Sequence, residues 1–381
     1  MFEFASPRVI FGPGSVERAG EIARALGQTA LVVTGRSNSR AERLIGILTA
    51  AHVSCERFVV AAEPSVDLVM EGALLARTAG AQVIVAIGGG SALDTGKAIA
   101  AMATNPGEIF DYLETIGRAR PLARPALPGV AIPTTAGTGS EVTRNAVVSS
   151  PAHRVKVSLR DPSMLPRVAI VDPSLALDLP PDITAATGLD ALTQLIEPYV
   201  SKKANPMTDA LASGGIRRVA GSLRRAVEAG HDLEARSDMA MGALSSGLCL
   251  ANAALGAVHG LAGPLGGLMG APHGLLCAAL LPHVMAANVA ALRRAGASPW
   301  LKRYDEVGRL LTGSAAAAAD DGVEWVRGVT RAIGIGRLGE HGLTDAVMAD
   351  VIEPALRASS MKGNPVELSP GELRDVLEQA R

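Results

Sequence analysis

The sequence predicts an α/β domain built on a parallel sheet, followed by a domain made almost entirely of helices. Up to about residue 178, apolar runs of strand type such as ALVVTG, QVIVAIGGG, GVAIPTT and VAIVDP alternate with helical stretches. Continuous apolar strands separated by helices are typical of a parallel sheet that is buried on both faces. Beyond Pro180 and Pro181 the strand-type runs disappear, and long segments rich in alanine and leucine continue to Arg381.

The proline pair marks the boundary that we expect between the two domains. A proline forces the residue before it out of helical geometry, so the pair ends one element before the next begins. We therefore expect an α/β domain over residues 1–178 and a helical domain over residues 179–381, with the cleft between them as the default binding site. The alanine tract at 315–319 fits a helix of the second domain.

Composition excludes several classes of protein. The chain has 381 residues, 48% of them hydrophobic, and a formal charge of −1, which suits two sizeable cores. The absence of a lysine or arginine run argues against nucleic-acid binding. The N-terminus has no basic segment followed by an apolar one, and no uninterrupted apolar stretch reaches about 18 residues, so we expect a cytoplasmic protein without a membrane span. Cys55, Cys249 and Cys277 lie in apolar contexts that suit reduced core thiols.

Two loops in the first domain point to a phosphate-bearing ligand. The strand in VIVAIGGGSALDTGKAIA runs into Gly88, Gly89, Gly90 and Ser91 and then into a helix. Glycines let the backbone approach a diphosphate closely, and the helix N-terminus offers free N–H groups, although such a cluster also serves as an ordinary turn. Lys97 strengthens the phosphate interpretation. The loop PTTAGTGSEVTRN at 133–145 follows another apolar strand at the same sheet edge.

Four polar residues in apolar segments of the second domain suggest a metal site. Asp190 and Gln194 are four residues apart, so on a helix they project from one face. His259 and His273 lie in glycine- and leucine-rich stretches. A buried imidazole needs a partner, and a divalent metal can satisfy two of them together with a carboxylate. The alternative is that each histidine is a hydrogen-bonded core residue.

The same segments resemble one protein family in the correct order along the whole chain. GGGSALDTGK, PTTAGTGSEVT, AIVDP followed by TGLDALTQLIEPYVS, the segment from His259 to His273 with LLPHVM after it, and MKGNPVELSPGEL are similar to the iron-containing (type III) alcohol dehydrogenases. The resemblance implies a Rossmann-like dinucleotide domain, a helical domain, and a metal in the cleft between them, in a fold shared with the dehydroquinate synthases. It also implies an NAD(P)-dependent alcohol dehydrogenase or aldehyde reductase, which we expect to be a homodimer.

The resemblance assigns roles to individual residues. The metal ligands that it implies are Asp190, Gln194, His259 and His273, and Asp190 and the two histidines are the expected catalytic residues. The metal is Fe2+ by family, with Zn2+ or Mn2+ as alternatives. The expected cofactor contacts are Gly35, Gly89, Gly90, Ser91, Asp94, Thr134, Thr135, Thr138, Asn145 and Lys156.

The chain departs from the family pattern at two positions. The family usually has histidine where this chain has Gln194. A carboxamide oxygen is a weaker and harder ligand than an imidazole, so we expect iron or zinc to be held less tightly and manganese to be tolerated better. Many members also carry a histidine where this chain has Gly263. Its loss either enlarges the substrate pocket or leaves proton transfer to water and the cofactor ribose.

The cofactor preference depends on the segment after ALVVT. NAD-preferring relatives often have an aspartate there that binds the adenosine ribose, whereas this chain has Gly35 and Arg36, with Arg40 close behind. Without that carboxylate nothing repels a 2′-phosphate, so we expect NADP(H) to be accepted. The alternative is that Arg36 points to solvent.

Three functions remain open at the level of the sequence. A metal-dependent NAD(P)-linked oxidoreductase would polarise a carbonyl oxygen with its cation while a hydride moves to or from the nicotinamide. A metal-independent reductase on the same scaffold, similar to the maleylacetate reductases, is the second interpretation, which Gln194 favours and the retained Asp190, His259 and His273 oppose. The third is cofactor-assisted elimination, as in the dehydroquinate synthases, or ligand binding without turnover. The expected substrate is a small alcohol or aldehyde.

Overall fold

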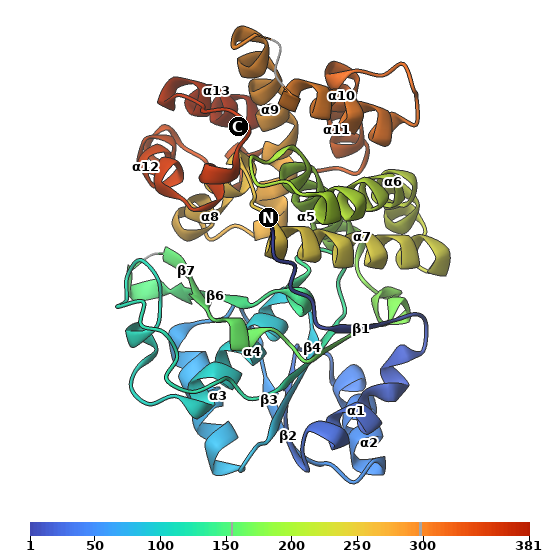
Figure 1. Ribbon diagram of the computed structural model, residues 1–381, viewed down its shortest axis with the longest axis vertical. Helices are drawn as coiled ribbons and strands as arrows, with labels where there is room; N and C mark the ends of the chain where they lie inside the picture. Colours follow the sequence, from blue (N-terminus) through green and yellow to red (C-terminus); the bar gives the residue numbers. More distant parts are fainter. Residues whose placement is uncertain (154, 297–298) are drawn as a thin grey trace. The chain divides into compact units, whose positions relative to one another are not determined.

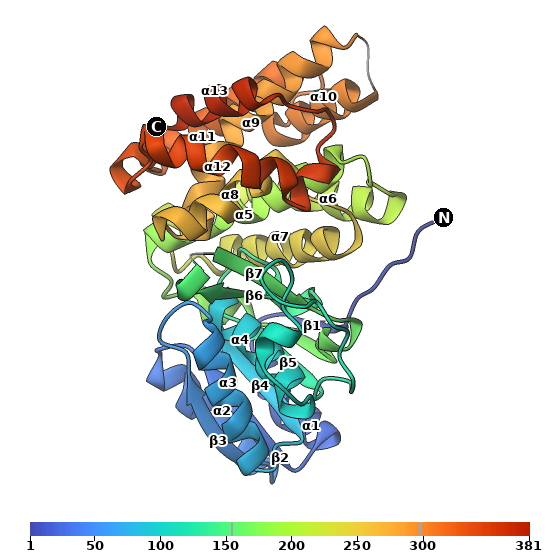
Figure 2. The ribbon, with the colours of Figure 1, turned by 90° about the vertical axis from the view of Figure 1, so that its left-hand side faces the viewer.

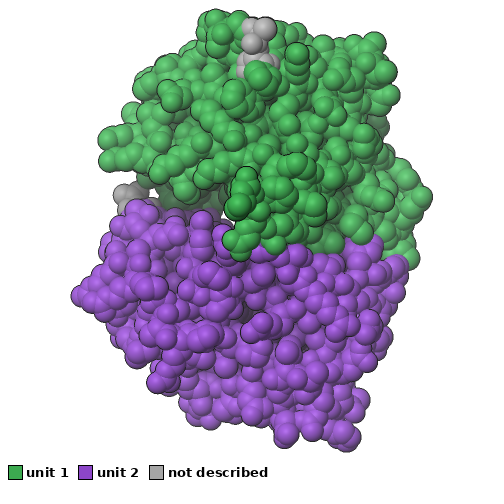
Figure 3. All heavy atoms as spheres, in the orientation of Figure 1, with its two compact units in different colours: residues 1–4, 136–138, 177–381 green, residues 5–135, 139–176 purple. Residues whose placement is uncertain are grey.

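The computed structural model describes residues 1–153, 155–296 and 299–381, and the chain forms two compact units (Figure 3). The first, here called the α/β unit, comprises Ala5–Thr135 and Gly139–Ala176. The second, here called the helical unit, comprises the C-terminal half and two short segments: Met1–Phe4, Ala136–Thr138 and Leu177–Arg381.

A six-stranded parallel sheet forms the centre of the α/β unit, so the predicted parallel sheet is confirmed (Figure 1). In spatial order its strands are β1 (Arg8–Phe11), β8 (Val168–Val171), β5 (Gly129–Pro133), β4 (Val83–Gly88), β2 (Thr29–Thr34) and β3 (Ser54–Val59). The four apolar runs of the sequence form the four inner strands. The two edge strands are more polar and carry a weaker signal.

Helices cover both faces of this sheet, which explains why its inner strands are apolar throughout. Val83, Val85 and Ile87 of β4 pack with α1 (Ala19–Leu26) and α2 (Asn38–Ala50) on one face. The alternate residues of β4 face the other way, toward α3 (Val66–Thr78) and α4 (Gly90–Thr104). Figure 1 shows α3 and α4 on one side of the sheet and α1 and α2 on the other, and Figure 2 shows the sheet from the side of α3. Successive side chains of a strand point to opposite faces, so a sheet covered twice needs an unbroken apolar run.

A two-stranded antiparallel hairpin, β6 (Asn145–Ser150) and β7 (Val155–Arg160), follows the second polar loop. Asn145 pairs with Arg160 at its open end. The backbone N–H of Val147 donates to the Asp94 carboxylate at 2.9 Å, which ties the hairpin to α4. The hairpin therefore lies beside the helix that begins at the glycine-rich loop.

The helical unit contains no strand among the described residues, so the predicted all-α second half is confirmed. Its first helix begins at Pro181, where the missing N–H of proline costs no hydrogen bond. Its helices are α5 (Pro181–Val200), α6 (Pro206–Glu228), α7 (Leu233–Asn252), α8 (Ala257–Met269), α9 (His273–Arg294), α10 (Pro299–Thr312), α11 (Ala319–Ala332), α12 (Asp345–Arg357) and α13 (Pro370–Ala380).

Two helices form the centre of this unit. Every residue of α5 from Gly188 to Val200 is buried, and α5 packs against α6, α7 and α9. By length and composition α9 could cross a membrane, and α7 with α8, bent by 95°, passes the same test as a pair. However, 72% of the most apolar window of α9 is buried inside the protein, which is typical of a core helix.

The alanine tract at 315–319 is not a helix, and that prediction was wrong. Residues 315 and 316 form a turn, and α11 begins only at Ala319. The carboxylate of Asp321 accepts the N–H of Ala318, and that of Asp305 accepts the N–H of Ala319. These side chains satisfy the first N–H groups of the helix and fix its start, which outweighs the modest helical propensity of alanine.

Candidate functional site

Three polar residues of α5 face one buried cluster. Asp190, Gln194 and Glu197 are spaced by four and three residues, so they lie on one face of the helix. All three are at most 5% exposed. Burying carboxylates is costly unless other groups compensate for their charge, so this face needs partners from neighbouring helices.

The partners come from α8 and α9. His259 is the third residue of α8, and His273 is the first residue of α9, with Cys277 one turn further along. The imidazole rings of the two histidines are 5.3 Å apart between centroids. One donor atom from each of Asp190, His259, His273 and Cys277 lies within 4.8 Å of the other three. We call these four residues the donor cluster.

Distances within the donor cluster suit a shared cation. Oδ1 of Asp190 lies 3.5 Å from Nε2 of His259 and 3.8 Å from Nε2 of His273. The Cys277 sulfur lies 3.8 Å and 3.6 Å from the same two nitrogens. Oδ1 of Asp190 and Oε1 of Gln194 are both buried, and neither atom has a hydrogen-bond partner among the described residues. A buried carboxylate oxygen without a donor that faces two imidazole nitrogens is the arrangement that a bound divalent metal would satisfy.

Gln194 and Glu197 hold the donor cluster in place. Nε2 of Gln194 donates to Oδ2 of Asp190 at 3.1 Å, which leaves Oδ1 facing the histidines. Oε2 of Glu197 lies 2.6 Å from Nδ1 of His259, and its Oε1 accepts the N–H of Val258 at 2.7 Å. A carboxylate on Nδ1 fixes the proton there, so the lone pair of Nε2 points into the cluster.

The charges of the cluster act strongly on each other. Burial raises the pKa of the Asp190 carboxyl, but the His259 imidazole 3.5 Å away and the nearby charge of His273 outweigh that effect and hold the pKa below its ordinary value. Burial lowers the pKa of His259, whereas the Cys277 sulfur, Glu197 and Asp190 raise it well above the histidine range. The centre therefore favours a positive charge beside Asp190, which either a proton or a metal ion can provide.

Gly263 leaves space in α8 one turn after His259. A Cβ added there would meet no atom within 4 Å, and the residue is only partly buried. The helix could therefore carry a side chain at this position without moving its neighbours.

The two expected phosphate loops follow β4 and β5, which are neighbours in the sheet, and Gly35 follows the next strand, β2. The chain leaves β2 for β3 on one side and reaches β4 on the other side, which makes this point the switch of the sheet, where open α/β sheets bind ligands. Gly89 precedes α4, and Gly90 and Ser91 form its first turn. At Gly88, which has a φ of 154°, an added Cβ would lie 2.6 Å from the Cβ of Ala92. The backbone of this glycine-rich loop is therefore tightly packed. It presents N–H groups, and not side chains, to a ligand.

The Asp94 carboxylate is occupied by contacts within the α/β unit. It accepts hydrogen bonds from the Ser140 hydroxyl at 2.5 Å and the Val147 N–H at 2.9 Å, and it pairs with Lys97 at 2.9 Å. Lys97 is buried and also donates to the Ser140 carbonyl and the Thr143 hydroxyl. Lys97 thus connects α4 to the second polar loop and does not project as a free cation toward a phosphate. These contacts fix one glycine-rich loop against the other.

The remaining expected cofactor residues lie at several places. Thr134 donates its N–H to Gly88, and the side chain of Thr135 would be 3.3 Å from a Cβ added at Gly89, so both lie beside the first loop. Gly35 follows β2 and donates its N–H to Ile87 of β4. Asn145 begins β6 and Lys156 lies on β7, where it pairs with Glu63 at 2.7 Å, whereas Thr138 belongs to a segment of the helical unit.

Arg36 is exposed but fixed at one point. Its Nε donates to the carbonyl of Ala61 at 2.7 Å, in the loop after β3. The guanidinium is thereby held beside the end of β2, so the residue does not simply extend into solvent.

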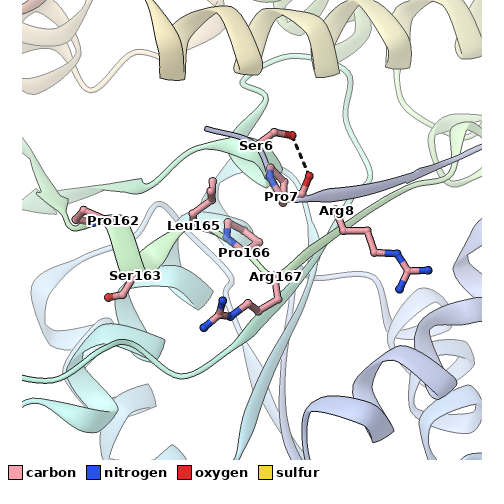
Figure 4. Close-up of a pocket in the computed structure, with 8 residues that line it drawn as sticks. All are labelled: Ser6, Pro7, Arg8, Pro162, Ser163, Leu165, Pro166 and Arg167. Carbon is pink, nitrogen blue, oxygen red and sulfur yellow. Dashed lines mark hydrogen bonds between the residues drawn. The ribbon is translucent and has the colours of Figure 1, made fainter. Parts of the chain in front are cut away.

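A pocket of about 210 Å³ lies at the opposite ends of the sheet strands (Figure 4). It is lined by the first residue of β1 and by residues that precede β1 and β8: Ser6, Pro7, Arg8, Pro162, Ser163, Leu165, Pro166 and Arg167. Because these lie at the amino ends of parallel strands, the pocket is separate from the glycine-rich loops at the carboxyl ends.

Comparison with known proteins identifies the class of this chain. Residues 6–173 match the family described as iron-containing alcohol dehydrogenase, and residues 184–381 match the C-terminal domain of the Fe-containing alcohol dehydrogenase family. The chain belongs to the iron-containing alcohol dehydrogenase family. It is therefore an enzyme, an alcohol oxidoreductase, and its family implies NAD(H) and a metal such as iron.

Individual relatives resemble the chain over its full length. A 1,3-propanediol dehydrogenase from Klebsiella pneumoniae is 36% identical over 392 residues, with 100% of this chain and 99% of the relative covered. The crystal structure of a 1,3-propanediol oxidoreductase matches with a TM-score of 0.92, 34% identity and 100% coverage of both chains. A sulfoacetaldehyde reductase from Bifidobacterium kashiwanohense, solved in complex with NAD+, matches with a TM-score of 0.87 and 30% identity over 99% of this chain and 98% of its own.

Sequence reasoning did not single out two residues of this centre. Cys277 was interpreted as a core thiol, although its position one turn after His273 on an apolar helix could have indicated a shared face. Glu197 lies seven residues after Asp190, which is two turns along α5, and that spacing could have indicated that both carboxylates lie on one face of the helix.

Proposed function

We propose that this protein is a metal-dependent, NAD(P)-linked oxidoreductase that interconverts a small alcohol and its aldehyde or ketone. The observation that carries this proposal is the buried Oδ1 of Asp190, which has no hydrogen-bond partner in the described part of the chain and lies close to the Nε2 atoms of His259 and His273. A divalent cation bound there would supply Lewis-acid stabilisation of negative charge on a substrate oxygen. Asp190, His259 and His273 are the proposed protein ligands and catalytic residues.

The chain's own residues prepare this site in several ways. Asp190 contributes one negative charge, and the imidazoles are neutral when they bind a metal, so these three groups suit a divalent ion. Gln194 fixes the orientation of the Asp190 carboxylate, and Glu197 fixes that of the His259 ring. Burial lowers the local dielectric constant and strengthens each of these interactions.

The α/β unit is proposed to bind the nicotinamide cofactor, which supplies or accepts the hydride. The glycine-rich loops at the carboxyl ends of β4 and β5 and the N-terminus of α4 support this, because free N–H groups and a helix dipole stabilise a diphosphate. A relative solved with NAD+ supports the same assignment. We extend it to NADP(H), since Gly35 places no carboxylate after β2 and Arg36 is fixed nearby.

Metal removal and reconstitution test the proposal. The purified enzyme is assayed for metal content, and its rates with a panel of small alcohols and aldehydes are measured with NAD(H) and with NADP(H). Chelation should abolish turnover, and one equivalent of Fe2+, Zn2+ or Mn2+ should restore it. Full activity of the metal-free protein would instead indicate a metal-independent reductase. Substrate conversion without net consumption of NAD(P)H would indicate elimination chemistry.

A further inference from the structure

We propose that the sulfur of Cys277, and not the side chain of Gln194, is the fourth metal-binding group of this centre. The resulting ligand set is Asp190, His259, His273 and Cys277. This inference rests on the proposed metal-dependent function and specifies the coordination chemistry of its site. It replaces the carboxamide ligand that the family pattern implies with a thiolate.

Four of the six distances among the donor atoms are close to those around a tetrahedral ion, and the other two are at most 4.8 Å. With metal–sulfur bonds of about 2.3 Å and metal–nitrogen or metal–oxygen bonds of about 2.0–2.1 Å, the sulfur–nitrogen edges of a tetrahedron are about 3.6 Å and the oxygen–nitrogen edges about 3.3 Å. The sulfur of Cys277 lies 3.8 Å and 3.6 Å from the two histidine Nε2 atoms. Oδ1 of Asp190 lies 3.5 Å and 3.8 Å from the same atoms. Small side-chain movements would therefore complete the tetrahedron.

The position of Cys277 distinguishes it from an ordinary core thiol. It lies one turn after His273 on α9, so its side chain is on the same face of the helix as that imidazole. Its sulfur faces two imidazole nitrogens, although the residue is fully buried. Cys249, also fully buried, has its sulfur 3.4 Å from the backbone carbonyl of Thr208, which is a normal partner for a protonated thiol.

Gln194 has a different task in this centre. Its Nε2 donates to Oδ2 of Asp190, the carboxylate oxygen that does not face the histidines. Reversing the amide would bring its oxygen against the carboxylate oxygen, so the hydrogen bond fixes the orientation. Gln194 therefore positions Asp190 through its Nε2, and its Oε1, which has no hydrogen-bond partner among the described residues, is the competing donor that the Gln194 and Cys277 variants below tell apart.

A thiolate ligand changes what the centre binds. Thiolates favour zinc over manganese, whereas an amide oxygen would favour the harder ion. The side chain of His273 is 40% exposed, so the donor cluster is not closed off from solvent at this residue.

Cobalt substitution provides a direct test. The full-length protein is stripped with a chelator under a phosphine reductant, and one equivalent of Co2+ is added. We expect a near-ultraviolet thiolate-to-cobalt charge-transfer band and intense visible bands typical of four-coordinate cobalt. The charge-transfer band should be absent in Cys277→Ser and Cys277→Ala but retained in Gln194→Ala and in the matched control Cys249→Ser. Cys277→Ser should also lower the ratio of zinc to manganese affinity by at least about 10-fold.

The outcomes separate this inference from the proposed function. Metal-dependent activity without a charge-transfer band in the cobalt protein, or with a band that persists in both Cys277 variants, would overturn the role of Cys277 and leave the function intact. Failure to bind cobalt, combined with full activity of the metal-free enzyme, would overturn both. Thermal unfolding of each variant checks that it is folded, and loss of the band in folded Cys277→Ser with cobalt still bound supports the inference.

Discussion

Gln194 donates its side-chain amide to Oδ2 of Asp190 at 3.1 Å, one turn away on the same helix. This contact fixes which carboxylate oxygen faces His259 and His273. Gln194, where the family resemblance implies a histidine, is therefore engaged with the carboxylate of the proposed metal site. Predictions for this residue and for its surroundings follow from that geometry.

Removing the Gln194 amide should weaken metal binding without abolishing it. Gln194→Ala leaves Oδ2 of Asp190 buried without its donor, and loss of such a supporting contact typically costs about 10- to 100-fold in metal affinity. A competition titration with a chelator measures the change. Thr193→Ala is the matched control, because Thr193 is buried on the same helix but bonds only to the Leu189 carbonyl in the contacts described. Equal affinities for wild type and Gln194→Ala would mean that the contact has no supporting role.

Removing His273 should abolish metal content and turnover together. In His273→Ala the centre loses a nitrogen donor, and the lost stabilisation of substrate charge amounts to several kcal/mol, on the order of 10³-fold in kcat/KM. Metal analysis and steady-state kinetics on the same preparation check this. His283→Ala on the same helix is the control, since His283 contacts Gln379 and lies outside the donor cluster. A His273→Ala enzyme with wild-type activity would remove His273 from the proposed centre.

A carboxylate after β2 should select against NADPH. A Cβ added at Gly35 meets no atom within 4 Å, so Gly35→Asp fits sterically. Its charge should penalise a 2′-phosphate by about 1–3 kcal/mol in kcat/KM, while NADH is unaffected or improved because the aspartate accepts bonds from the ribose hydroxyls. Gly35→Asn controls for size without charge. Equal losses with both cofactors would show only that the end of the strand was disturbed.

Glu141 should make the protein less stable as the pH rises toward neutrality. This residue is 3% exposed, and burial raises the pKa of its carboxyl from 4.5 to about 7, against the opposing effects of a backbone hydrogen bond and Lys97. Between these values the folded state binds more protons than the unfolded state, so the free energy of unfolding falls with pH, by on the order of 3 kcal/mol across the window.

Urea unfolding of wild type and Glu141→Gln between pH 4.5 and 7 tests this expectation. The free energy of unfolding of Glu141→Gln should not show this fall with pH. The variant should therefore be more stable than the wild type at pH 7. Glu71→Gln, an exposed glutamate of α3, controls for the loss of one charge. Parallel profiles for wild type and Glu141→Gln would contradict a protonated Glu141.

The sequence predicted the parts of the fold that depend on local periodicity. The four apolar runs became the inner strands β2, β4, β5 and β8, because each must be apolar on both faces. The edge strands and the β6–β7 hairpin were not predicted, since none of them is buried on both faces and none forms a continuous apolar run. The start of α11 was not predicted either. It is decided by the carboxylates of Asp321 and of Asp305, which lies 14 residues before Ala319, and composition does not reveal such contacts.

The donor cluster was predicted in the same partial way. Asp190, Gln194, His259 and His273 attract attention as polar residues in apolar surroundings, and the structure brings them together; their roles toward a metal stay a prediction. Cys277 escaped notice because a cysteine in an apolar helix looks like any core residue. Only the packing of α9 brings its sulfur to the two imidazoles.

The placement of Asp190, Gln194 and Glu197 on a single helix has a consequence for how the protein folds. Their partners come from α8 and α9, so the unfolded chain holds no preformed site and a metal ion gains its full set of ligands only after these helices have docked. An ion that binds only the docked state shifts the folding equilibrium by mass action. Amide hydrogen exchange in α5, α8 and α9 should therefore slow together when metal is added, which makes these three helices one cooperative folding unit with the ion as its last component.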